Sequence, residues 1–350
     1  MLLIAWALLG WRALRQTQIR TANEIIVPPG IDSEERVQLG GVEQAIQIRG
    51  RDRTRPVLLI LHGGPGVPDM PVGYLNAALE KDFVVVQWDQ RGAGKSFDSH
   101  IPPETMRIAQ IESDARELTD LLRKRFGQDR IFLAGHSTGT VIGVLLARDA
   151  PQLFRAYVGI SQVANLQETE KLLYDFAVRA AREQHNSEAE DEMAKIGRPP
   201  FANAKELQVS QKWVNKFAPD HFGAVSFDRW RLLFFSPSYS LSDLIRMVRG
   251  AKFSFDNLWR EFFAVDLFTA APRLEVPVYF FAGRDDHVVT SEIAQKYFAA
   301  LDAPRGKELI WFEHSSHWPQ LDEPEKFRDT MVHRVLEQNR QSNPAVPAQE

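Results

Sequence analysis

The sequence contains no cysteine among its 350 residues, which excludes disulfides, thiolate nucleophiles and cysteine-ligated metal sites. It also lacks a strong charge of either sign: the formal net charge is −4, which gives no reason to expect nucleic acid as a partner. No group of His, Asp and Glu has the spacing of metal ligands. What remains, 44% hydrophobic and 25% charged residues, is typical of an enzyme with a sizeable core.

A membrane-spanning apolar run is missing as well. Met1–Trp11 carries no charge, but it is much shorter than the roughly 20 apolar residues that a spanning helix needs. No basic region precedes it, as a secretory signal would require, and Arg12, Arg15 and Arg20 follow it. Three interpretations stay open: a clipped anchor, an interfacial helix with a basic flank, or a helix packed on the body. The expected location is cytoplasmic or membrane-associated through this segment.

Short strand-like segments alternate with helical ones along much of the chain. The expected strands are residues 42–48, 57–61, 83–86, 131–134, 156–160, 278–282 and 308–312. This alternation predicts an α/β fold with a mostly parallel sheet and helices on both faces. The segment 162–270 shows helical periodicity and many aromatic residues but no strand pattern, which indicates an inserted helical cap. The predicted organisation is an N-terminal apolar segment and linker (1–34), a core (35–161 and 271–338), the cap (162–270) and a disordered tail (339–350).

A candidate nucleophile stands where one apolar strand turns into an apolar helix. Gly135-His-Ser-Thr-Gly139 fits the pattern G-x-S-x-G between residues 131–134 and 141–147. A serine in such a strained turn projects its hydroxyl above the sheet, and the glycines on either side let strand and helix approach closely. Ser137 is therefore the predicted nucleophile.

The partners that a serine nucleophile needs follow in the order acid, then histidine. Asp285 and Asp286 come after the strand at 278–282, and either could orient an imidazole. His314 and His317 come after the next strand, and either could be the base. Position in the sequence alone does not decide between the two aspartates or between the two histidines.

Donors for a developing oxyanion are expected in the loop His62-Gly-Gly-Pro-Gly66, which follows the strand at 57–61. A tetrahedral intermediate needs backbone N–H groups, usually one from this loop and one from the residue after the nucleophile. This assigns the N–H groups of Gly64 and Thr138.

Three of these motifs together resemble the proline iminopeptidase family of α/β-hydrolases: the His62–Gly66 loop, Trp88-Asp-Gln-Arg-Gly-Ala-Gly-Lys-Ser96 and the pentapeptide around Ser137. The resemblance covers residues 35–161 and 271–338. It implies an α/β-hydrolase fold. It also selects Asp286 through the family's Gly-x-x-Asp, and His317 through the acidic-Pro pair at 322–324.

The resemblance further implies an aminopeptidase that uses no cofactor or metal and releases N-terminal residues, often proline, from short peptides. In that family, cap carboxylates bind the substrate amine, one of them in a Trp-x-x-Trp-Glu stretch that this cap lacks. Glu261 and Asp228 are the possible substitutes. The alternatives are an esterase or amidase for small apolar acyl substrates and, more remotely, a non-catalytic binding protein with the same fold.

Two other features are expected to be structural. Gly94-Lys95-Ser96 is like the end of a phosphate-binding loop, but Asp89 stands where that motif needs its first glycine. Arg91 is expected to be a structural ion-pair partner rather than a catalytic group.

Overall fold

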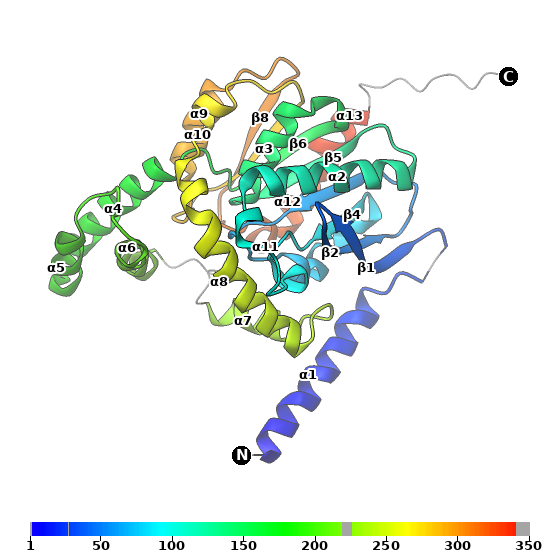
Figure 1. Ribbon diagram of the computed structural model, residues 1–350, viewed down its shortest axis with the longest axis horizontal. Helices are drawn as coiled ribbons and strands as arrows, with labels where there is room; N and C mark the ends of the chain where they lie inside the picture. Colours follow the sequence, from blue (N-terminus) through cyan, green and yellow to red (C-terminus); the bar gives the residue numbers. More distant parts are fainter. Residues whose placement is uncertain (1, 27, 219–225, 341–350) are drawn as a thin grey trace.

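The computed structural model describes residues 2–26, 28–218 and 226–340, and its centre is one eight-stranded sheet (Figure 1). The strand order is β1-β2-β4-β3-β5-β6-β7-β8. β2 pairs antiparallel with β1 and β4, and all other neighbours are parallel. The strands are β1 (Ile31–Leu39), β2 (Val42–Gly50), β3 (Val57–Leu61), β4 (Val84–Trp88), β5 (Ile131–His136), β6 (Phe154–Ile160), β7 (Val278–Gly283) and β8 (Lys307–Phe312).

Both faces of the sheet are covered, because alternate residues of the central strands point to opposite sides. In β3, Val57, Leu59 and Leu61 join one buried cluster, while Leu58 and Ile60 join another. The first cluster contains residues from α2 (Ile108–Phe126), α3 (Gly139–Asp149) and α10 (Ser291–Ala300). The second contains residues from η1 (Met70–Lys81), α12 (Pro324–Thr330) and η5 (Met331–Leu336).

The predicted fold class is confirmed, and each of the seven predicted strands is present. The sequence pattern missed β1, whose residues Ile31–Leu39 are mostly polar and alternate between half-buried and exposed positions at the edge of the sheet. The predicted boundary at residue 35 therefore falls inside a strand. Of the predicted tail, residues 339 and 340 belong to α13 (Glu337–Arg340), and 341–350 lie outside the described residues.

A set of helices lies between β6 and β7 in the sequence (Figure 1). It comprises α4 (Leu166–Glu183), α5 (Ser187–Ile196), α6 (Ala204–Phe217), α7 (Phe227–Phe234) and α8 (Leu241–Ala264). The first three share a small core of their own, which includes Leu173, Met193 and Trp213. An isolated bridge between Asn165 and Asp266 joins the two ends of the insertion. The remaining short helices are η2 (Gly94–Ser96), η3 (Pro103–Thr105), η4 (Pro151–Leu153), α9 (Leu267–Ala270) and α11 (Pro319–Asp322).

The N-terminal helix α1 (Leu2–Ala22) projects from the body (Figure 1), and contacts along its second half attach it. Arg12 donates to the carbonyls of Phe234 (2.8 Å) and Tyr239 (2.7 Å), and Gln16 donates to that of Ser236 (2.5 Å). The half before Arg12 is apolar and exposed at every described side chain. No helix among the described residues is long and apolar enough to cross a membrane.

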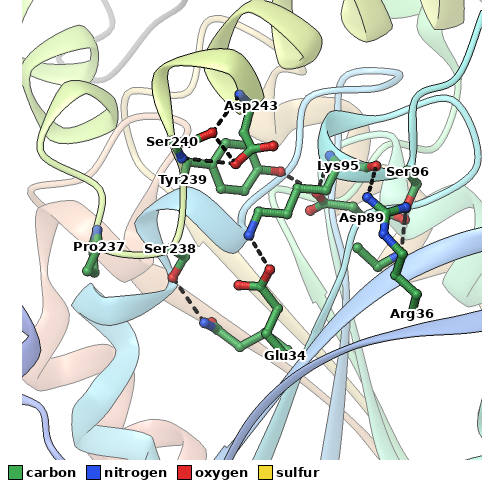
Figure 2. Close-up of polar contacts among 12 residues, drawn as sticks. Glu34, Arg36, Asp89, Lys95, Ser96, Pro237, Ser238, Tyr239, Ser240 and Asp243 are labelled. Atoms are coloured by element: carbon green, nitrogen blue, oxygen red, sulfur yellow. Dashed lines mark hydrogen bonds and ion pairs between the residues drawn. The ribbon is translucent and has the colours of Figure 1, made fainter.

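The phosphate-loop-like segment is built into the fold (Figure 2). The backbone N–H of Lys95 donates to Asp89 Oδ2 at 2.7 Å, and the Lys95 ammonium pairs with Glu34. Tyr239, from the loop before α8, donates its hydroxyl to the same Asp89 oxygen. The Lys95–Ser96 stretch therefore joins β1, the loop after β4 and the start of α8, and this explains its polar residues without a bound phosphate.

Candidate active site

Ser137 occupies the turn between β5 and α3 with a left-handed backbone conformation (φ 53°), which is costly for a non-glycine residue. The turn is held from both sides: Ser137 N donates to Ile160 O at 3.0 Å, and Thr140 N donates to Ser137 O at 2.9 Å. A Cβ on Gly135 would lie 2.7 Å from the carbonyl oxygen of Gly139, so strand and helix can approach only with glycine there. The predicted strained turn is present.

The His62–Gly66 loop lies directly against this serine. A Cβ on Gly63 would lie 2.7 Å from Ser137 Cβ, so a larger residue would displace the candidate nucleophile. His62 fixes the loop: Nε2 accepts from Gln90 N at 3.1 Å, which leaves Nδ1 to donate to the Gly63 carbonyl at 2.9 Å. Burial lowers the pKa of His62 to about 4, so the ring stays neutral in this role.

Of the two candidate oxyanion donors, Thr138 directly follows Ser137, and Gly64 follows Gly63, which lies against Ser137. Gly64 has φ 125°, a conformation that favours glycine, and Thr138 is the N-cap of α3. Neither backbone N–H has a hydrogen-bond acceptor among the described residues. Two unsatisfied donors beside a serine are what a developing oxyanion requires.

Asp286 and His317 form a buried pair in which Oδ2 and Nδ1 are 3.0 Å apart. The other carboxylate oxygen accepts from the N–H groups of Val288 (2.9 Å) and Val289 (3.1 Å). Burial would raise the pKa of Asp286, but His317 and these donors outweigh it and lower the pKa to about 2. An ionised Asp286 makes Nδ1 of His317 the donor, which leaves the lone pair on Nε2.

The loops that carry this pair are tied together. Arg284 and Glu313 form two hydrogen bonds of 2.8 Å between the loop after β7 and the loop after β8. The acidic pair further along holds the second loop, since Asp322 accepts from Ser316 N (3.0 Å) and Glu323 from His314 N (3.0 Å).

Position in the sequence also allowed Asp285 as the acid and His314 as the base. Both are exposed, whereas Asp286 and His317 are buried and paired with each other. The geometry thus brings together the acid and the histidine that the family resemblance selected.

His136, the second residue of the pentapeptide, was not singled out by the sequence. Its Nε2 donates to the carbonyl oxygen of His317 at 3.0 Å, and Ser161 donates to the same oxygen at 3.1 Å. Its ring packs on Trp318 with centroids 4.2 Å apart. Burial and the neighbouring His317 lower the pKa of His136 to about 3, so it acts as a neutral donor. A histidine beside the serine is the only sequence signal of this anchor.

Asp69 lies behind His136, with Oδ2 3.9 Å from His136 Nδ1. Burial raises the pKa of Asp69 to about 6, although the charges of Arg229 and His317 act in the opposite direction. Its Oδ1 is buried without a hydrogen-bond partner among the described residues. A second carboxyl group is therefore close enough to influence the candidate base.

Ser137 and His317 line one cavity of about 290 Å³, which we call the catalytic cavity. Its floor comes from the core of the molecule and its roof from α4, α6, α7 and α8. The roof residues are Leu173, Gln211, Val214, Asn215, Arg229 and Phe255. Among the described lining residues none is a carboxylate, and Arg229 lies over the Trp318 ring at 4.7 Å.

The two carboxylates proposed for a substrate amine have other contacts. Glu261 accepts from Ile108 N at 2.8 Å and pairs with Arg107 at 3.1 Å, so it caps the first turn of α2. Asp228 pairs with Arg231 one turn along α7 at 3.2 Å. Neither lines the catalytic cavity. Helical position could not reveal this, because it does not specify which way a cap helix faces.

Fold and site together define a hydrolase of the α/β class, and the comparisons with known proteins agree. Residues 56–324 match the model of the α/β hydrolase fold family, so the chain belongs to this family.

Its similarity extends to particular proteins. It is 32% identical to a probable aminopeptidase, YbaC, of Bacillus subtilis over 84% of this chain and 93% of that protein. It is 25% identical to a proline iminopeptidase of Saccharolobus solfataricus over 81% of this chain and 85% of that one. The crystal structure of proline iminopeptidase from Mycobacterium smegmatis shares the fold, with a TM-score of 0.65, 18% identity, and coverage of 89% of this chain and 100% of that structure. The resemblance predicted from the motifs is confirmed.

Proposed function

We propose that this protein is a serine hydrolase in which Ser137 is the nucleophile, His317 the general base and Asp286 the residue that orients it. The observation that carries the proposal is the buried 3.0 Å pair of His317 and Asp286, which shares a cavity with a serine held at φ 53°. A histidine with only a structural role would not need an ionised carboxylate partner that itself accepts two backbone hydrogen bonds. It would also not need a strained serine in the same cavity.

In the proposed reaction Ser137 Oγ attacks the substrate carbonyl carbon while His317 Nε2 takes the hydroxyl proton. The N–H groups of Gly64 and Thr138 bind the oxyanion that forms. His317 then returns the proton to the leaving amine or alcohol, and the bond between the carbonyl carbon and that group breaks. Water, deprotonated by His317, hydrolyses the acyl-enzyme and frees Ser137. Asp286 stays ionised and stabilises the imidazolium at each stage.

For the substrate we propose short peptides with a free N-terminus. The names of the relatives support this: a probable aminopeptidase at 32% identity and proline iminopeptidases at lower identity. The apolar part of the roof, Leu173, Val214 and Phe255, suits proline or another small hydrophobic residue.

A second candidate is hydrolysis of uncharged acyl esters or amides. The lining of the catalytic cavity favours it, because its described residues include Arg229 and no carboxylate. An ammonium brought into such a cavity would find no acidic acceptor among those residues, and its burial would be unfavourable.

A hydrolysis panel decides between the two. Prolyl, alanyl and leucyl p-nitroanilides would be compared with p-nitrophenyl acetate and butyrate, using the natural protein and Ser137→Ala. Faster cleavage of the free aminoacyl arylamides than of their N-acetylated forms supports the aminopeptidase. Cleavage of esters alone supports the second candidate. Failure of the natural protein on every substrate, or equal rates with Ser137→Ala, would reject the serine hydrolase.

We also propose that α1 inserts into one leaflet of a membrane. Its first half exposes Ile4 (67%), Trp6 (70%) and other apolar side chains. The ten residues 2–11 span about 15 Å, close to half of the roughly 30 Å hydrocarbon core. The exposed Arg15 and Arg20 follow on the side where anionic headgroups would lie, whereas Arg12 is buried against the body.

A further inference from the structure

A second cavity, of about 450 Å³, lies within the cap between α4, α6 and α8. We call it the cap cavity. Its apolar walls include Phe201, Leu207, Trp259 and Phe263. The rings of Trp259 and Phe263 meet edge to face with centroids 5.6 Å apart, so two of these walls support each other. None of these residues takes part in the proposed hydrolysis.

The cap cavity adjoins the catalytic cavity, because three helices contribute to both. Glu170 and Leu173 of α4 line the cap cavity and the catalytic cavity respectively. On α8, Trp259 lines the cap cavity and Phe255, stacked on it at 6.2 Å, lines the catalytic one. The residues of each pair are three or four positions apart, so about one turn of each helix lies between the two cavities.

Leu207 and Gln211 repeat this arrangement on α6. Gln211 interacts with the Glu170 carboxylate, so these two side chains form part of the wall between the cavities.

Glu170 is the unusual residue of the cap cavity. The residue is only 4% exposed, and its Oε2 is buried without a hydrogen-bond partner among the described residues. A buried carboxylate oxygen without a donor is unfavourable unless a cation or a proton meets it. Burial raises the pKa of Glu170 to about 7, although the Gln211 amide favours the ionised form. No residue of the proposed catalytic machinery needs this carboxylate.

The two cations at the cavity carry other interactions. The Lys171 ammonium is 2.7 Å from Glu168 Oε1, and the Arg260 guanidinium lies over the Trp259 ring at 5.7 Å. Glu170 is thus the buried charge, whereas Lys171 and Arg260 belong to more exposed positions of the wall.

We propose that the cap cavity is a second binding site, and that it takes a protonated amine carried on an aromatic or apolar body. The ammonium meets Glu170, and the apolar body lies against Trp259, Phe263 and Leu207. Aromatic rings add to this preference, because their faces attract cations. Such an amine is either a separate molecule or the distant end of a long substrate that reaches through the wall at Gln211.

The test measures binding of phenethylamine by calorimetry, with 2-phenylethanol and 3-phenylpropionate as neutral and anionic probes of similar shape. We expect the amine to bind more tightly than both. Glu170→Gln should weaken the amine about tenfold and change the alcohol little, because it removes the charge but keeps the shape. Trp259→Leu should weaken both amine and alcohol. Glu183→Gln, at the exposed C-terminal end of α4 and away from the cap cavity, is the matched control and should change neither.

Amine binding by a protein whose Ser137 is blocked with phenylmethylsulfonyl fluoride shows which of the two cavities holds the amine. If the blocked protein still binds the amine, and the amine affects ester hydrolysis by the unblocked protein non-competitively, the cap cavity is supported as the site of a separate molecule. Retained binding together with lower KM for arylamides that carry a distant amine supports the end of a long substrate.

Equal binding of amine and alcohol, tighter binding of the anion, or loss of binding in the blocked protein would each overturn the proposal. These outcomes are separate from the proposed hydrolysis, which would be rejected by a lack of turnover in the natural protein whatever the amine does.

Discussion

At the scale of single residues, the Ser137, His317 and Asp286 assignment leads to a ranking of variants. Ser137→Ala should keep the fold and lower kcat/KM by at least about 10³-fold, because it removes the nucleophile. Asp286→Asn should also be severe, since Nδ1 of His317 loses its ionised acceptor. Asp285→Asn, an exposed neighbour, is the matched control and should be mild. Steady-state kinetics with circular dichroism check this, and the reverse order of the two Asp variants would contradict it.

Asp69 should set the pH dependence of the same site. The positive charge of an imidazolium at His317 lowers the pKa of Asp69, and by reciprocity an ionised Asp69 raises that of His317. Because the pKa of Asp69 is about 6, its carboxylate is mostly ionised at neutral pH. Asp69→Asn removes this negative charge, so His317 should lose its proton at lower pH.

We therefore expect the acidic limb of the kcat/KM profile on a neutral ester to move toward acid by a few tenths to about one pH unit. Asp285→Asn again serves as the control, because its exposed charge is screened by solvent. A shift toward alkaline pH in Asp69→Asn, or none at all, would show that the two groups are not coupled.

The strained turn at Ser137 could be predicted from sequence because it imposes local requirements: glycines at 135 and 139, and apolar runs on both sides. The choice of Asp286 and His317 required the family resemblance, since Asp285 and His314 fit the same strand ends. What separates them is burial and a contact across two loops, which depend on how β7 and β8 pair. His136, Asp69 and Glu170 could not be found, because each acts through a neighbour far away in the sequence.

At the scale of secondary-structure elements, Glu261 is expected to stabilise α2 rather than bind substrate. Its carboxylate accepts from Ile108 N at 2.8 Å in the first turn of that helix. Glu261→Ala should lower the free energy of unfolding by about 1 kcal/mol, the usual loss for a helix cap, and leave KM unchanged for arylamides and esters. Asp256→Ala, more exposed on the same helix α8, should change stability by less than about 0.5 kcal/mol. A rise in KM for arylamides alone would restore Glu261 as the amine acceptor.

The two halves of α1 should respond differently to truncation. Removing residues 1–10 deletes exposed apolar side chains, so activity on a soluble ester should be unchanged while binding to anionic phospholipid vesicles is lost. Removing residues 1–20 also deletes Arg12 and Gln16, which donate to the carbonyl of Phe234 at the end of α7 and to two carbonyls of the loop before α8. The longer truncation should therefore lower the melting temperature as well. Vesicle flotation and thermal unfolding test this. If the full-length protein stays in the vesicle-free fraction after flotation, membrane insertion is refuted.

For the whole molecule, the sequence predicted the parallel core well because buried strands need short apolar runs that are easily recognised. β1 was not predicted because a polar edge strand has no such apolar run. The cap was predicted as helical, but not the way its helices face, and so Glu261 was assigned to a site that it does not line. Packing direction within an insertion depends on contacts between helices that are far apart in the chain.

One buried ion pair connects several of these distant parts. Arg91, in the loop after β4, pairs with Asp114 of α2 at 2.9 Å, and both side chains are almost fully buried. Arg91 also donates to the carbonyl of Gly40 in the β1–β2 turn at 2.8 Å, while Gln44 of β2 donates to Asp114 at 2.7 Å. This confirms the structural role expected of Arg91.

Asp114→Ala should therefore destabilise the whole protein, because it leaves the Arg91 charge buried without its partner. We expect a loss of about 3–5 kcal/mol in the free energy of unfolding. Asp120→Ala, which breaks an exposed pair with Arg123 on the same helix, should cost less than about 1 kcal/mol. Replacing both buried partners, as Arg91→Met with Asp114→Leu, should recover part of the loss, since no unpaired charge remains. Urea unfolding of the four proteins provides the measurement, and equal stability of Asp114→Ala and Asp120→Ala would show that the buried pair does not hold these elements together.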